Sequence, residues 1–151
     1  MREILFRGQK IDNGEWVYGS YVNQYGCHEI MLDGVDSEYG FDHYHVSPET
    51  VGQYTGLKDK NGKRIFEGDI LKTCNGAWEW MHEDSYDIRV SVVGFEDGSF
   101  VLDDTYSSDG YNELSCVHEE YACSNGEYED YVIFEVIGNI YDNPELLKGE
   151  K

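Results

Sequence analysis

The sequence predicts a mainly β protein, with antiparallel hairpins closing into a small barrel or sheet and with short helical turns. Seventeen glycines and two prolines separate short runs of alternating apolar and polar residues, which is the pattern of strands joined by tight turns. No run long enough for a regular core helix repeats its apolar residues with a 3.6-residue period. The 151 residues fit one domain or two very small ones.

Residues 3–22 predict an opening hairpin. Apolar residues recur at even spacing on both sides of Asn13 and Gly14. An Asn-Gly dipeptide favours the tight type I′ turn, because both central residues of that turn need a positive φ. The stretch 23–45 that follows is polar and aromatic without a clean period, so an irregular strand and loop is expected there.

A helical turn and two further β-turns are expected in the middle of the chain. Ser47 and Pro48 have the residue types of a helix cap and first helical position. The Asn61-Gly62 dipeptide and the segment 67–69 then predict two turns that join three short strands.

The best-defined hairpin lies at residues 90–102, around Asp97 and Gly98. A two-residue turn at these positions places two apolar pairs on one face of the hairpin. The pairs are Phe95 with Phe100 and Val93 with Leu102.

The last strand is expected at residues 131–137, a nearly continuous apolar run that predicts burial on both faces at the centre of a barrel or sheet. Asn143 and Pro144 then open a short terminal helix that ends near Gly149. Two acidic insertions, 75–87 and 103–130, lack alternation and are expected to be surface excursions, the second with a short helical turn at 114–121.

The negative charge is concentrated in the second half of the chain. Eleven basic and 31 acidic residues give a net charge of −20, and Arg89 is the one basic residue between positions 73 and 147. Such a field repels phosphate backbones and anionic lipid, which argues against direct binding of nucleic acid or membrane. It favours a cationic partner, whereas the alternative is that the charge serves solubility alone.

The N-terminus lacks an apolar signal region and no run approaches a membrane span, so a cytoplasmic protein is expected. Thiols stay reduced in that compartment, which predicts free cysteines rather than a disulfide framework. The cysteine spacing contains no C-x2-C pair and so does not favour zinc. The cysteines are Cys27, Cys74, Cys116 and Cys123.

Four phrases resemble the YopX family, small proteins found mainly in phages and prophages of bacteria. They are FRGQKIDNGEWVYG, VGQYTGLKDKNGKRIFEGDILK, VVGFEDGSF and EVIGNIYDNPELL. The resemblance implies a single YopX-type domain over residues 1–151 and a mainly β fold, and it transfers no activity or catalytic residue. Division into an N-terminal hairpin subdomain 1–50 and a barrel-like part 51–151 is the alternative.

The four segments that resemble the family specify a fold rather than a reaction. Their succession of Gly-Asp entry, strand, Asp-Gly hairpin and closing strand is similar to a small SH3-like barrel, an analogy that carries no function. Their apolar residues are core candidates: Trp16, Tyr18, Phe66, Ile70, Phe95, Phe100, Phe134 and Ile140.

His43 and His45 would share one face of a strand and offer two metal ligands, but the sequence supplies no third ligand. The competing interpretation is a pair of half-exposed histidines that stack with tyrosines. No EF-hand register, P-loop or other catalytic motif fits, so we expect no catalytic residues, no cofactor and no bound metal. The basic residues around Asn61 and Gly62 are expected to be a solvated hairpin end.

The sequence therefore favours a non-enzymatic module that binds a protein with a basic surface, because tyrosines supply contact area and carboxylates supply steering. Oligomer formation is compatible with it. One alternative is an acidic mimic of nucleic acid that inhibits a host DNA-binding protein, and another is a small hydrolytic enzyme using carboxylates. The expected partner-binding residues are Glu119, Glu120, Glu127, Glu129 and Asp130.

Overall fold

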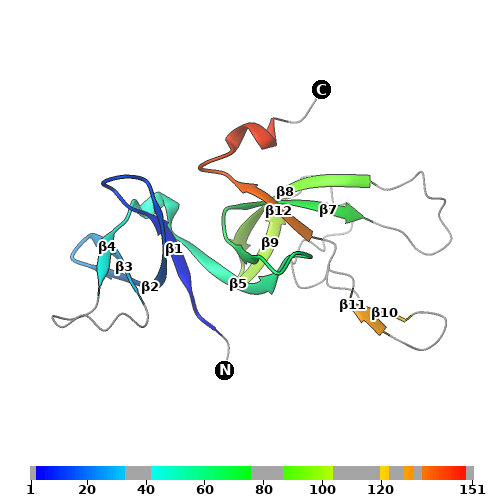
Figure 1. Cartoon of the computed structure of the whole chain (residues 1–151), viewed down its shortest axis with the longest axis horizontal. Coiled ribbons are helices and arrows are strands. Elements are labelled where there is room, and N and C mark those ends of the chain that lie inside the picture. The colour runs from blue at the N-terminus through cyan, green and yellow to red at the C-terminus, as the bar shows by residue number, and fades with distance from the viewer. Residues whose placement is uncertain are drawn as a thin grey trace. The chain divides into compact units, whose positions relative to one another are not determined.

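The computed structural model describes residues 3–32, 42–75, 87–103, 120–122, 128–130 and 134–148. These residues form antiparallel strands and two short 3₁₀ turns, which confirms the mainly β prediction. The chain divides into two compact units, Met1–Leu57 and Lys58–Lys151. Figure 1 shows both units, with every strand except β6 labelled.

In the first unit the strands pair in the order β4-β3-β2-β1-β5, so that β5 lies beside β1 and not beside β4. The strands are β1 (Phe6–Gln9), β2 (Trp16–Gln24), β3 (Cys27–Met31), β4 (His43–His45) and β5 (Gly52–Lys58). The β1–β2 pair confirms the opening hairpin. The stretch 23–45 was expected to be irregular, and this expectation is wrong for the described part, which contains β3 and β4.

The turn of the opening hairpin differs from the sequence prediction, and a second turn joins β2 to β3. At the first turn Gly14 has a φ of 72° while Asn13 does not have a positive φ. The turn is closed by a backbone hydrogen bond from the Lys10 N–H to the Glu15 carbonyl, so it is longer than two residues. Both central residues of the β2–β3 turn, Tyr25 and Gly26, have positive φ, at 54° and 81°.

The core of the first unit lies on one face of the β1–β2–β3 sheet. It consists of Val17, Ile30 and Val46, with Phe6, Tyr21, Leu32, Tyr44 and Val51 packed around them. Gly19 allows β2 and β3 to approach, because a Cβ there would lie 1.9 Å from the Met31 carbonyl oxygen. Tyr18 alternates with these residues and is 47% exposed, so the core prediction for Tyr18 is wrong.

The helical turn η1 (Pro48–Thr50) is present with Pro48 at its start, as predicted. Ser47 makes no side-chain capping bond. Thr50 organises the turn instead, since its hydroxyl donates to the Ser47 carbonyl at 2.7 Å and accepts from the Gln9 N–H at 2.9 Å.

The second unit contains a four-stranded sheet in the order β12-β7-β8-β9. Its strands are β7 (Asp69–Asn75), β8 (Asp87–Glu96), β9 (Ser99–Asp103) and β12 (Phe134–Asn139), and the short β6 (Arg64–Phe66) precedes them. The two predicted turns between 58 and 69 are confirmed. Within the described residues the strands do not close into a barrel, so the SH3-like closure is not confirmed.

The β8–β9 hairpin has the predicted register, Phe95 with Phe100 and Val93 with Leu102. Val93 and Leu102 are buried, whereas Phe95 is 51% exposed and its core prediction is wrong. The pairing of β7 with β8 begins at Val92, so Phe95 extends beyond β7.

The position of strand β12 differs from the sequence prediction of a central strand. It is an end strand of the described sheet rather than a central one, and its residues from Glu135 on are partly exposed. The terminal helix is the 3₁₀ turn η3 (Pro144–Leu147), and Asn143 makes no side-chain capping bond there. This turn approaches β12 closely, because a Cβ at Gly138 would lie 2.6 Å from the Asn143 Oδ1.

Candidate functional site

Three of the five predicted partner-binding residues lie in a separate antiparallel pair, β10 (Glu120–Ala122) and β11 (Tyr128–Asp130). We call this pair the acidic hairpin. Its register partners are Glu120 with Asp130, Tyr121 with Glu129 and Ala122 with Tyr128. Glu119 and Glu127 lie outside the described residues.

The structure places residues 120–122 in a strand. The expectation of a helical turn that reaches residue 121 is therefore wrong for these residues. Most of that expected turn and of the two acidic insertions lies outside the described residues. The sequence between the two strands contains Asn125-Gly126, a dipeptide typical of hairpin turns that could have indicated this pair.

The register of the acidic hairpin places two acidic residues opposite each other, Glu120 and Asp130. Like charges at opposite positions of a ladder destabilise it. An isolated two-stranded hairpin is also only marginally stable in water.

The two histidines of β4 lie beside a carboxylate of β3. Glu29 is the register partner of His45, and Met31 is the partner of His43. The Glu29 Oε1 atom is 3.4 Å from the His45 Nδ1 and 3.9 Å from the His43 Nε2. The sequence could not supply Glu29 as a third group because its position depends on the β3–β4 register.

His28 occupies a different environment, hydrogen bonded through its Nδ1 to the Tyr21 hydroxyl and stacked on that ring. His43 and His45 contact each other edge to face, with ring centroids 6.4 Å apart. In the described ranges, no group of three or more His, Cys, Asp and Glu side chains could hold a metal ion.

The side chain of Asp59 organises a turn within residues 51–72, one of the four segments that resemble the YopX family. Its Oδ1 accepts the N–H groups of Asn61 and Lys63 at 2.8 and 2.9 Å, and its Oδ2 accepts that of Val136 in β12 at 3.0 Å. Burial raises the pKa of Asp59, but these three N–H donors lower it by more, so the pKa lies below its ordinary value of 3.8. Asp59 therefore has a structural role in the second unit.

The basic residues around the Asn61-Gly62 turn include a lysine engaged in an ion pair. The Lys60 ammonium is 2.7 Å from the Glu135 Oε2 in β12. The pair is exposed on both sides, so it contributes little stability. It also reduces the positive charge that this turn could offer to an anion.

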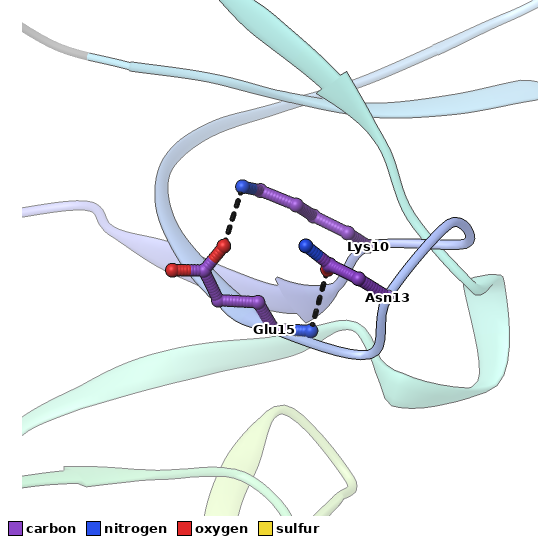
Figure 2. A network of polar contacts seen from close by, with 3 residues as sticks. All are labelled: Lys10, Asn13 and Glu15. Atoms are coloured by element: carbon purple, nitrogen blue, oxygen red, sulfur yellow. Dashed lines mark hydrogen bonds and ion pairs between the residues drawn. The ribbon is translucent and has the colours of Figure 1, made fainter.

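A polar network closes the β1–β2 turn, as Figure 2 shows for Lys10, Asn13 and Glu15. The Lys10 ammonium donates to the Glu15 carboxylate at 2.7 Å, and the Glu15 N–H donates to the Asn13 side-chain oxygen at 3.0 Å. The hydrogen bond between Lys10 and Glu15 raises the pKa of Lys10 and lowers that of Glu15. The ammonium also lies 4.1 Å from the centre of the Tyr44 ring, so this network ties the turn to β4.

A family model described as YopX protein matches residues 5–148. The chain belongs to the YopX family. It is also 31% identical over 90 residues to the SPbeta prophage-derived uncharacterized protein YopX of Bacillus subtilis (strain 168). That match covers 60% of this chain and 54% of the relative, so the matched part spans about half of the relative's length.

A solved structure, the crystal structure of protein EF1440 from Enterococcus faecalis, is similar with a TM-score of 0.50 and 22% identity. The match covers 97% of this chain and 99% of that one. At this identity the similarity concerns the fold alone. The named YopX relative is prophage-derived and uncharacterized, so the family membership transfers no reaction or partner. No helix in the described part of the chain is long and apolar enough to cross a membrane.

Proposed function

We propose that this YopX-family protein is a non-enzymatic binding module whose acidic hairpin recognises a basic surface on another protein. The observation that supports this most is the register pairing of Glu120 with Asp130. Like charges at register partners destabilise a ladder, and a Lys or Arg side chain of a partner bound there would offset that penalty.

The charge of the surrounding sequence supports the same proposal. Residues 73–147 contain 18 acidic residues and one basic residue. A field of this kind accelerates encounter with a positively charged partner and disfavours wrong partners. Tyr121 and Tyr128 lie in the same two strands, and tyrosine is enriched where proteins contact each other.

Capture from bacterial lysate at low and high salt tests the proposal. The test variant carries amides in place of the five carboxylates, at Glu119, Glu120, Glu127, Glu129 and Asp130. A matched control removes the same number of charges at exposed positions elsewhere, namely Asp12, Asp42, Glu96, Asp97 and Asp103.

We expect wild type and control to retain a protein at low salt and release it at high salt, because exposed charges are screened beyond about 10 Å at 0.1 M. The hairpin variant is expected to lose that protein at low salt while staying folded. Equal capture by both variants, or no salt-sensitive capture, would assign the charge to solubility.

Mimicry of nucleic acid is the second candidate, favoured by the same charge. Under it, the captured protein is a host DNA-binding protein and added duplex DNA displaces the YopX-family chain. A captured protein that DNA does not displace would refute mimicry and leave the binding proposal intact. For the hydrolase alternative, the residues that the structure describes offer no positive evidence of catalysis.

A further inference from the structure

We propose that the turn between β2 and β3 is a self-association surface, through which two copies of this chain contact each other around Tyr25. The surface lies in the first unit and does not rest on the function proposed for the acidic hairpin. In the β2–β3 ladder Gln24 is the register partner of Cys27, so Tyr25 and Gly26 are the two residues of the turn.

Tyr25 is displayed to solvent in an unfavourable backbone conformation. The residue is 97% exposed and its φ is 54°, a value at which Asn, Asp and Gly are the common residues of such turns. A ring with this exposure gains almost no packing within its own chain to offset the backbone cost. Contact with another molecule would offset it, because tyrosine supplies a large, rigid contact area at low entropic cost.

The hairpin around Tyr25 carries no charged residue. Residues 16–28 contain no Asp, Glu, Lys or Arg, although these types make up 28% of the chain. The residues that flank the turn, Asn23, Gln24 and Cys27, are all exposed. Charged residues are depleted at the centre of protein interfaces while tyrosine is enriched there. The exposed end of this hairpin therefore has the composition of an interface centre.

The partner that an uncharged surface on this chain fits best is a second copy. The chain has a net charge of −20, so two copies repel each other, and the repulsion is weakest where charged residues are absent. In a two-fold symmetric contact, each residue near the axis faces the same residue of the other copy. Any charge there would face a like charge, and a turn without charged residues avoids this repulsion.

Two-fold symmetry also determines which side chains meet. A contact centred on Tyr25 brings the two tyrosine rings together, and aromatic pairs attract each other beyond the area that they bury. Cys27 is two residues away, is exposed and carries a free thiol. The two Cys27 thiols of the dimer therefore lie near each other, which gives the contact a chemical readout.

Sedimentation equilibrium of the full chain, with a reductant present, tests the proposal at low and high concentrations of NaCl. We expect a dimer that strengthens as salt is raised, because salt screens the repulsion between two acidic chains. This response is opposite in sign to that of the acidic hairpin, whose binding weakens with salt, so the two proposals can fail separately.

Tyr25→Asn is expected to weaken the dimer at least about tenfold, because loss of a central aromatic anchor has an effect of this size. Asparagine tolerates a positive φ, so this variant should keep the turn and the wild-type unfolding midpoint in urea. The matched control is Ile11→Asn, which removes a 66% exposed apolar residue outside residues 16–28. The control is expected to dimerise as the wild type does.

Crosslinking with a short bifunctional maleimide tests which residues meet in the dimer. We expect the wild-type chain to form crosslinked dimers at high salt. The yield should fall in Cys27→Ser, and also in Tyr25→Asn, which retains Cys27. A wild-type chain that stays monomeric at high salt, wild-type dimerisation of Tyr25→Asn, or undiminished crosslinking of Cys27→Ser would overturn the proposal.

Discussion

Replacement of Asp59 by asparagine tests the role assigned to the most engaged carboxylate of the second unit. Asp59 is 4% exposed and accepts three backbone N–H groups with its two oxygens. Asparagine retains one acceptor oxygen and presents an NH₂ group in place of the other. Whichever way the amide is turned, at least one of these part-buried N–H groups faces another donor.

The loss of unfolding free energy expected for Asp59→Asn follows from these three hydrogen bonds. A buried donor left unsatisfied costs about 1–3 kcal/mol, and hydrogen bonds to a charged acceptor contribute about 1.5–3 kcal/mol. We therefore expect Asp59→Asn to lower the free energy of unfolding by about 2–4 kcal/mol at neutral pH. In urea, with a slope of about 2 kcal/mol per M, the midpoint falls by roughly 1–2 M.

The pH dependence of unfolding gives an independent test of the contribution of Asp59 to stability. The pKa of Asp59 in the folded chain lies below its ordinary value of 3.8. Its contribution to stability is therefore present above the unfolded-state pKa and is lost as the pH falls through the folded-state pKa. The difference between wild type and Asp59→Asn should shrink as the pH drops below 3.8.

Urea unfolding followed by circular dichroism measures both effects. The matched control is Asp97→Asn, at an exposed turn residue with a φ of 49°, a conformation that asparagine tolerates. We expect the control to unfold within about 0.5 kcal/mol of wild type. An unchanged midpoint for Asp59→Asn would refute the reasoning.

Three further predictions concern the fold and its metal requirement. Gly19→Ala should destabilise the first unit by at least about 2 kcal/mol in urea unfolding, because its Cβ would meet the Met31 carbonyl at 1.9 Å, while Gly94→Ala, whose Cβ meets the nearest atom at 3.8 Å, should have a much smaller effect. Equal midpoints for the two alanine variants would contradict the close approach. EDTA should leave the melting temperature unchanged, because the Cys and His spacings match no structural zinc pattern, and a drop of many degrees would contradict this. A far-ultraviolet dichroism spectrum should show less than about a fifth of helix, and a helix-dominated spectrum would refute the mainly β fold.

Local signals predicted the parts of the fold that depend on neighbouring residues. The β8–β9 hairpin has the predicted register because Asp97 and Gly98 both take the positive φ that a two-residue turn needs. The β2–β3 turn could not be predicted in this way. Tyr25 is not a typical residue for positive φ, and strand pairing on both sides sets its conformation.

Features that depend on residues far apart in the sequence could not be predicted from local patterns. The apolar run before residue 138 predicted a central strand, yet β12 is an end strand of the described sheet. The two histidines of β4 are two apart in the sequence, whereas the carboxylate of Glu29 lies beside them only through strand register. The acidic hairpin was missed as a strand pair although Asn125-Gly126 signalled it.

We have proposed the acidic hairpin as the contact surface for a basic protein. An NMR titration of the ¹⁵N-labelled chain with the protein captured from lysate tests this proposal. We expect the largest amide shift changes to fall within residues 119–130 and to fade as salt is raised. Shift changes confined to the first unit, with residues 119–130 unaffected, would contradict it.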